Sequence, residues 1–250
     1  MKREIYLPIL GIVAGELMMF SGQVFAGLLI HIINLQAMTL FLIFGDKSSD
    51  NKKLLQSLIL VLLIRIINLA VPQFFTGALL MYPMTYGVMF IPIYIIVKNQ
   101  HISLKEMGID FKKLSFSFPA ALLIGSMIAL LEYLILKPSA LIESLQLSNI
   151  ILLAIVMFIF VGAVEELVFR SILQTRLEEA FGLQPGLILS GFLFGIMHSA
   201  YGLVFEILFA GFFGLVIGYI FQRTRSFPFV LTIHGTANVL LFGILPILLK

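Results

Sequence analysis

The sequence predicts an all-α polytopic membrane protein, a bundle of eight or nine transmembrane helices. Three features of the composition support this fold class: 60% of the 250 residues are hydrophobic, only 12% are charged, and the mean hydropathy is +1.11. A soluble domain has about 25% charged residues, so this chain has too few charges to cover a water-soluble globule. Its apolar runs are long and continuous, whereas the strands of a membrane β-barrel are short and alternate in polarity.

Composition also excludes several classes of function. Cysteine is absent, which rules out disulfides, thiol catalysis and thiolate metal ligands. The net charge of +3 comes from 16 basic and 13 acidic residues, and no basic cluster resembles a nucleic-acid footprint. We therefore expect the lipid bilayer as a partner and no nucleic acid.

Apolar runs long enough to cross a bilayer, about 20 residues each, predict the individual spans. They are 5–22, 24–44, 54–75, 77–97, 117–137, 149–171, 185–201, 203–222 and 227–249. The first two runs could instead form one broken helix, which is why the expected number is eight or nine.

Basic residues in the connecting loops predict the orientation. Lys2 and Arg3 flank the first span at its start. The others follow alternate spans and are Lys47, Lys52, Lys53, Lys98, Lys105, Lys112, Lys113, Arg176, Arg223 and Arg225. The positive-inside rule places these loops and the N-terminus in the cytoplasm, with Lys137 and Lys250 as weak exceptions. The short apolar connections favour a multi-pass protein of a prokaryotic plasma membrane.

The longest polar loop, 98–116, is predicted to lie at the cytoplasmic interface. It could form a short amphipathic helix that directs Ile102, Leu104, Met107 and Ile109 toward the lipid headgroups.

Ionisable residues inside the spans need an explanation, because each costs roughly 2.5–3.5 kcal/mol on insertion. They are Glu16, His31, Arg65, Glu132, Glu165, Glu166, Arg170, His198, Glu206 and His234. We expect Glu16, Arg65 and Glu132 to form pairs between helices. His31 is expected to be a satisfied interior histidine, and Glu206 to reach the headgroups.

Polar residues of the C-terminal half form three motifs at helical spacing. They are Glu165-Glu166 with Arg170, Phe194 with His198, and His234 with Asn238. Residues four apart share a helix face, so one glutamate of the first motif can pair with the arginine, while its neighbour is rotated by about 100° and remains free. Three consecutive spans thus present polar groups to a common interior. We expect a conical cavity there that opens to the cytoplasm and supports general acid/base chemistry.

These motifs resemble those of the CPBP family of intramembrane endopeptidases, also called the Abi or CAAX-protease-like family, which includes the type II CAAX prenyl endopeptidases. The resemblance covers about 160–242, and 105–109 is similar to the loop that precedes the family's core. It implies a single membrane domain over 1–250. That domain would comprise accessory N-terminal helices at 1–97, the cytoplasmic interfacial loop at 98–116 and a CPBP-like catalytic core at 117–249.

The resemblance implies a glutamic-type endopeptidase that hydrolyses a peptide bond of a membrane-associated or lipidated peptide or protein. Glu165 would act as general base and, with His198, would activate a water molecule. His234 and Asn238 would donate hydrogen bonds to the developing oxyanion. The supporting residues would be Glu166, Arg170 and Phe194.

Two alternatives remain open at this point. Glu165, His198 and His234 could hold a zinc ion with water as its fourth ligand, and members of the family have been described as metalloproteases. The zincin motif HExxH is absent, and we expect no cofactor. The alternative function is a non-catalytic immunity or scaffold protein of the same family. A transporter is disfavoured because no internal repeat is visible.

Overall fold

The computed structural model describes residues 3–45, 49–70, 78–110 and 114–249, and the regular structure within these ranges is entirely helical. The predicted all-α fold class is therefore confirmed. In chain order the α-helices are α1 Arg3–Phe20, α2 Val24–Phe44, α3 Ser49–Ala70, α4 Ala78–Asn99, α5 Leu114–Leu136, α6 Leu147–Ile155, α7 Ala163–Glu166, α8 Thr175–Phe181, α9 Leu183–Ile196, α10 Val204–Thr224, α11 Phe227–Val239 and α12 Leu245–Leu248.

Eight of the described helical segments are long and apolar enough to cross a membrane. They are Val24–Phe44, Asn51–Ala70, Met81–Asn99, Phe118–Leu136, Leu147–Phe181, Leu183–Tyr201, Val204–Thr224 and Phe227–Leu248. Helix α1 is not among them, because its 18 residues include three charged ones. The protein is thus a multi-pass membrane protein.

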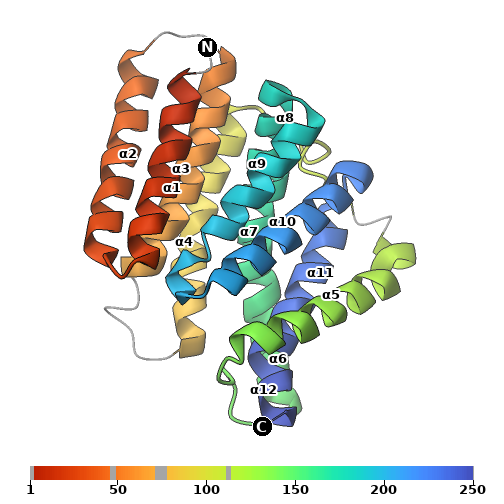
Figure 1. The fold of residues 1–250 in the computed structure, drawn as a ribbon. Coiled ribbons are helices and arrows are strands. Elements are labelled where there is room, and N and C mark those ends of the chain that lie inside the picture. Colours follow the sequence, from red (N-terminus) through yellow and green to blue (C-terminus); the bar gives the residue numbers. More distant parts are fainter. Residues whose placement is uncertain (1–2, 46–48, 71–77, 111–113, 250) are drawn as a thin grey trace.

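The first two helices form an antiparallel hairpin, which lies beside α3 in Figure 1. Gly11 of α1 faces Asn34 of α2, and Gly15 faces His31, so the pairing runs in opposite directions along the two helices. The chain reverses at Gly22, whose positive φ of 85° suits glycine. The alternative in which the first two spans form one broken helix is therefore wrong.

Helix α3 joins this N-terminal hairpin to the C-terminal half. Leu54, Leu55, Leu58 and Leu62 are almost completely buried, and their spacing places them along one stripe of the helix. Helix α3 packs against α1, α2 and α4 and also against the segment Leu167–Phe181. The N-terminal helices are therefore part of one bundle with the C-terminal half.

The basic loops gather at one end of the bundle. The side chain of Gln100 donates to the carbonyl oxygen of Lys53 at 3.0 Å and accepts from Arg176 at 2.7 Å. Arg225 forms an ion pair with Glu178 at 2.5 Å. Four parts of the chain that carry or adjoin basic residues thus meet at one end of the bundle, and the side of the membrane on which this end lies stays a prediction. Lys2, Lys47, Lys112 and Lys113, which also support that prediction, lie outside the described residues.

The loop at 98–116 differs from its prediction. Turns at 100–101 and 104–108 take the place of an amphipathic helix. Helix α5 begins already at Leu114, while 111–113 lie outside the described residues. Ile102 and Met107 pack into the protein, whereas Leu104 is exposed. The loop is tethered to the core: the Ser171 hydroxyl donates to the carbonyl of Met107 at 2.8 Å.

The turns of this loop are capped locally. The Glu106 carboxylate accepts hydrogen bonds from the amide and the hydroxyl of Ser103, both at 2.7 Å, and these bonds lower the pKa of Glu106 below its ordinary 4.5. These reciprocal bonds are those that cap the first turn of a helix. The turn does not continue into a helix because Gly108 has a positive φ of 74°, a conformation that ends a helix.

The segment Leu147–Phe181 forms one continuous helical run of 35 residues, ten residues longer at its end than the predicted span 149–171. Two stretches of it, Val156–Gly162 and Leu167–Gln174, are π-helical, and the four-residue α7 lies between them. A π-helical turn widens a helix and shifts the side chains beyond it, and such turns are frequent at functional sites. The di-glutamate motif is in α7.

Candidate active site

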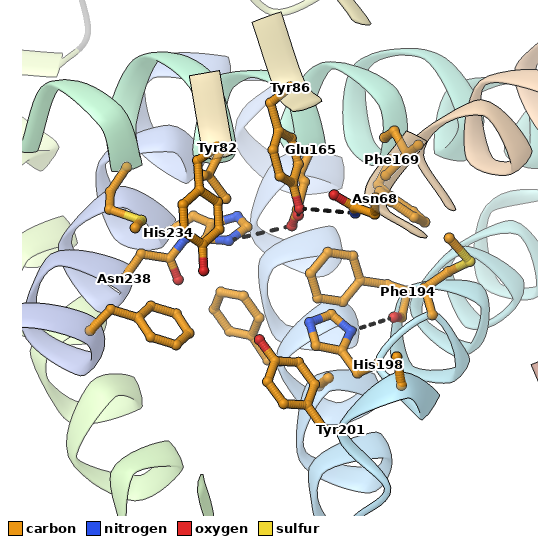
Figure 2. Close-up of a pocket in the computed structure, with 18 of the residues that line it drawn as sticks. Asn68, Tyr82, Tyr86, Glu165, Phe169, Phe194, His198, Tyr201, His234 and Asn238 are labelled. Carbon is orange, nitrogen blue, oxygen red and sulfur yellow. Dashed lines mark hydrogen bonds and ion pairs between the residues drawn. The ribbon is translucent and has the colours of Figure 1, made fainter. Parts of the chain in front are cut away.

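A cavity of about 140 Å³ lies among the helices and has room for several water molecules. Its polar and charged lining residues are Arg65, Asn68, Tyr82, Tyr86, Glu132, Glu165, His198, Tyr201, His234 and Asn238. Figure 2 shows that side chains of both halves of the chain point into it. All four predicted catalytic residues line this single cavity.

Glu165 is held by a tyrosine from the N-terminal half. The hydroxyl of Tyr86, on α4, donates to Oε1 of Glu165 at 2.7 Å, and the amide of Asn68, on α3, lies 3.4 Å from the Tyr86 oxygen (Figure 2). The Glu165 side chain is 13% exposed, so it reaches the cavity and is not sealed in the protein. Its second oxygen, Oε2, faces His234.

His234 lies between the two glutamates. Its Nδ1 is 2.6 Å from Oε1 of Glu166, and its Nε2 is 3.6 Å from Oε2 of Glu165. A carboxylate only accepts hydrogen bonds, so Nδ1 donates to Glu166. A ring that carries both protons can then direct Nε2–H toward Glu165 or toward a substrate oxygen. Gly235 allows helix α11 to lie close to Phe158, since a Cβ at this position would lie 2.6 Å from the Phe158 ring.

Glu166 and Arg170 form the ion pair that their spacing predicted. The Arg170 guanidinium lies 3.3 Å from Oε1 of Glu166, and both side chains are almost completely buried. The guanidinium carbon also lies 4.3 Å from the ring centroid of Phe194. A cation over an aromatic face is stabilised electrostatically. Phe194 thus covers the guanidinium, and its ring also contacts the rings of His198 and His234.

His198 follows the last turn of α9. Its Nδ1 lies 2.9 Å from the carbonyl oxygen of Phe194, and its ring stacks on Tyr201 with 6.1 Å between centroids (Figure 2). Because a carbonyl oxygen can only accept, Nδ1 carries the proton. In the neutral ring Nε2 is therefore an unprotonated acceptor, which suits a group that takes a proton from water.

Residues 147–240 match the family model described as type II CAAX prenyl endopeptidase Rce1-like. The match covers less than half of the chain and supports the resemblance of this segment to the CAAX-protease-like family. It contains all three motifs and the helices that carry them, whereas the helices of the N-terminal half lie outside the match. No curated protein and no solved structure is significantly similar to the chain. The family supports a membrane protease whose substrate is membrane-associated.

The CAAX-protease-like segment does not form its cavity alone. Asn68, Tyr82 and Tyr86 come from α3 and α4, and sequence reasoning did not select them because it considered only ionisable residues inside the spans. The spacing of the two tyrosines, four residues apart in an apolar run, was the available signal. They form a stacked pair with 6.2 Å between ring centroids.

The cavity lies away from the basic end of the bundle. At 1.5 Å per residue, Glu165 is about 16 Å along its helix from Arg176, and Tyr82 is about 24 Å from Lys98. Tyr201 lies in the connection between α9 and α10, at the end opposite the basic loops. Helix α9 runs away from the basic loops, and its histidine follows its last turn. The opening of the cavity toward the cytoplasm stays a prediction.

The predicted partners of the charged residues outside the motifs are confirmed only in part. Glu16 and Arg65 form the expected pair between helices. The expectation of a satisfied histidine is met in part: Nε2 of His31 lies 3.1 Å from Glu16, whereas its buried Nδ1 has no hydrogen-bond partner among the described residues. Glu132 of α5 interacts with the carboxyl group of Glu206 on α10. Glu206 does not reach the headgroups, because it is completely buried, and that prediction is wrong.

The alternative zinc ligands do not fit an ion as they are arranged. Across the described ranges, no three His, Asp or Glu side chains gather closely enough to hold one metal ion. The first oxygen of Glu165 is bonded to Tyr86 and Nδ1 of His198 to a carbonyl, which leaves one donor atom on each. The absence of a cofactor remains a prediction.

Proposed function

We propose that the protein is an intramembrane endopeptidase that hydrolyses a peptide bond of a membrane-associated or lipidated peptide or protein. The observation that carries this proposal is the Glu165 carboxylate, which reaches a cavity with room for water together with two histidines whose Nδ1 atoms each lie against an acceptor oxygen. A purely structural polar network would have no reason to leave a carboxylate and an imidazole acceptor facing an open space.

The first chemical step is the activation of water. A water molecule in the cavity is bound by Oε2 of Glu165 and by Nε2 of His198, both of which accept hydrogen bonds. As the water oxygen forms a bond to the carbonyl carbon of the substrate, Glu165 takes one of its protons. The electron pair of the carbonyl double bond moves to the substrate oxygen, and a tetrahedral intermediate results.

The second step needs donors for the oxyanion and a proton for the leaving group. Asn238 lies one turn beyond His234 on α11, and both side chains line the cavity. Their N–H groups donate to the oxyanion. When the carbon–nitrogen bond breaks, the proton held by Glu165 passes to the leaving nitrogen, so the products are a carboxylic acid and an amine. Glu166, Arg170 and Phe194 hold His234 in place.

The substrate class follows from the family. Its name describes a prenyl endopeptidase, so a peptide with a prenylated cysteine near its C-terminus is the first substrate to test. We further propose that the protease is of the glutamic type and needs no metal, which metal analysis of the purified protein and activity in the presence of a chelator would test.

The test uses the full-length protein in lipid nanodiscs and an internally quenched peptide with a farnesylated cysteine three residues before its C-terminus. Glu165→Gln and His198→Ala should each lower kcat by about 100- to 10,000-fold, the usual contribution of a general base. Glu143→Gln, at an exposed glutamate outside the cavity, is the matched control and should retain wild-type activity.

Folded Glu165→Gln protein that cleaves at the wild-type rate would contradict the proposed chemistry. The non-catalytic alternative makes the opposite prediction in cells. An immunity or scaffold protein should still function when Glu165, His198 and His234 are all replaced by alanine, whereas a protease should not.

A further inference from the structure

A second buried polar cluster lies next to the cavity, centred on Glu16 of α1. Arg65 of α3 donates to both oxygens of this carboxylate, through Nε at 2.7 Å and Nη2 at 2.5 Å. Nε2 of His31, on α2, lies 3.1 Å from Oε1. All three side chains are at most 5% exposed. A charge at this depth is stabilised only when it is paired and hydrogen-bonded, and Glu16 is.

The same cluster extends to the backbone and side chain on either side of His198. Nη2 of Arg65 also donates to the carbonyl oxygen of Met197, and the hydroxyl of Ser199 donates to Oε2 of Glu16. Met197 precedes His198 and Ser199 follows it. The cluster therefore holds the chain immediately before and immediately after the histidine, through contacts that span more than 130 residues of sequence.

His198 needs such support because it lies beyond the end of its helix. Helix α9 ends at Ile196, and the backbone of His198, with φ −90° and ψ 6°, has left the helical conformation. Carbonyl groups in the last turn of a helix lack helical partners, and Arg65 supplies one for Met197. Helix α1 also packs against the short turn Ser199–Tyr201. Without these contacts the histidine would be hydrogen-bonded only within its own segment, to Gly195, Phe194 and Tyr201.

We propose that Glu16, Arg65 and Ser199 are positioning residues that fix His198 so that its Nε2 points at the water site. This inference rests on the proposed function, since it assigns the N-terminal helices a part in the same reaction. Glu16 and Arg65 lie outside the segment 147–240 that matches the family model, so the family motifs alone leave out part of the site. Under this proposal the N-terminal helices fix the position of His198 in addition to enclosing the cavity.

The test compares three variants of the full-length protein in nanodiscs. Ser199→Ala removes one tether and should lower kcat with the farnesylated peptide about 10-fold, leaving KM unchanged, because the buried serine does not line the cavity. Arg65→Gln removes both the cation and the Met197 tether. It should lower kcat about 100-fold, the effect expected when a reacting group moves by about 1 Å.

Arg176→Gln is the matched control. Arg176 is as buried as Arg65, and it also bonds a residue of the N-terminal half, Gln100, but it lies at the basic end of the bundle, far from His198. If kcat depends only on the contacts of Arg65 with Met197 and of Ser199 with Glu16, the Arg176→Gln variant should keep kcat within about 2-fold of wild type. An equal loss in Arg176→Gln and Arg65→Gln would overturn the proposal, because general loosening of the bundle would then explain both.

A spectroscopic measurement separates positioning from activity. The chain has four histidines, so ¹⁵N-histidine labelling gives few signals, and His198→Ala identifies the one of interest. Wild-type protein should show His198 as a single Nδ1–H tautomer, because Nδ1 donates to the Phe194 carbonyl. In Ser199→Ala and Arg65→Gln the imidazole can move away from that carbonyl, so both variants should show a mixture of tautomers. An unchanged tautomer together with unchanged kcat in both variants would refute the positioning role.

This readout also distinguishes the two proposals. If the wild-type protein and Glu165→Gln have the same activity, the proposed function fails, yet the tautomer shift still shows whether the cluster holds His198. If Glu165→Gln is inactive while Ser199→Ala and Arg65→Gln are wild-type in kcat and tautomer, the protease stands and the positioning inference fails.

Discussion

Replacement of Arg170 by glutamine should destabilise the protein strongly. The guanidinium is 1% exposed, lies 3.3 Å from a completely buried carboxylate and covers the ring of Phe194 at 4.3 Å. Without it, Glu166 remains in the core with His234 as its partner at 2.6 Å. Removal of one member of a buried ion pair costs about 3–5 kcal/mol. The lost cation–π contact is worth about 0.5–2 kcal/mol.

The measurement is the free energy of unfolding of the purified protein in mixed micelles, titrated with sodium dodecyl sulfate. Arg176→Gln provides the comparison, because its ion-pair partner Glu179 is 54% exposed and the pair is worth about 1 kcal/mol or less. The double variant Glu166→Gln/Arg170→Gln should recover much of the stability, since it leaves no buried charge without a partner. Arg170→Gln protein within 1 kcal/mol of wild type would refute the reasoning.

Three further predictions concern the site and its orientation. Tyr86→Phe should lower kcat about 10- to 100-fold with KM unchanged, because a hydrogen bond to a charged group is worth about 1.5–3 kcal/mol; an unchanged kcat would contradict this. Gly235→Ala should destabilise by about 1–3 kcal/mol through overpacking against Phe158 and should lower activity, measured by the same titration and peptide assay. Since the chain has no cysteine, Leu104→Cys and Ser139→Cys can be labelled singly in intact cells with an impermeant maleimide. The positive-inside orientation predicts labelling at 139 and not at 104, and the reverse pattern would overturn it.

Much of the fold was predictable because it depends on local properties of the sequence. Long apolar runs predicted the spans, and spacing of four residues predicted the Glu166–Arg170 pair, which the structure contains. The loop at 98–116 was predicted wrongly for an equally local reason: Gly108, with a positive φ of 74°, ends the single turn that Ser103 and Glu106 cap.

The position of Glu206 could not be predicted from the sequence. Its place near the start of an apolar run suggested that it reached the headgroups, yet it is buried against Glu132 of another helix. The neighbouring helices determine which face of a transmembrane helix is buried. Because these helices are apolar on nearly all faces, their sequences carry little information about which face that is.

The sequence by itself determined that this protein lives in a membrane, and it determined the order of its three motifs. It did so because hydropathy and helical periodicity are properties of neighbouring residues. Only the tertiary structure decided that Tyr86 bonds Glu165 and that Arg65 reaches the carbonyl next to His198, across 79 and 132 residues of sequence respectively. It also decided that the cavity lies away from the basic loops. These features depend on how the helices pack, and no periodicity within a single helix encodes that packing.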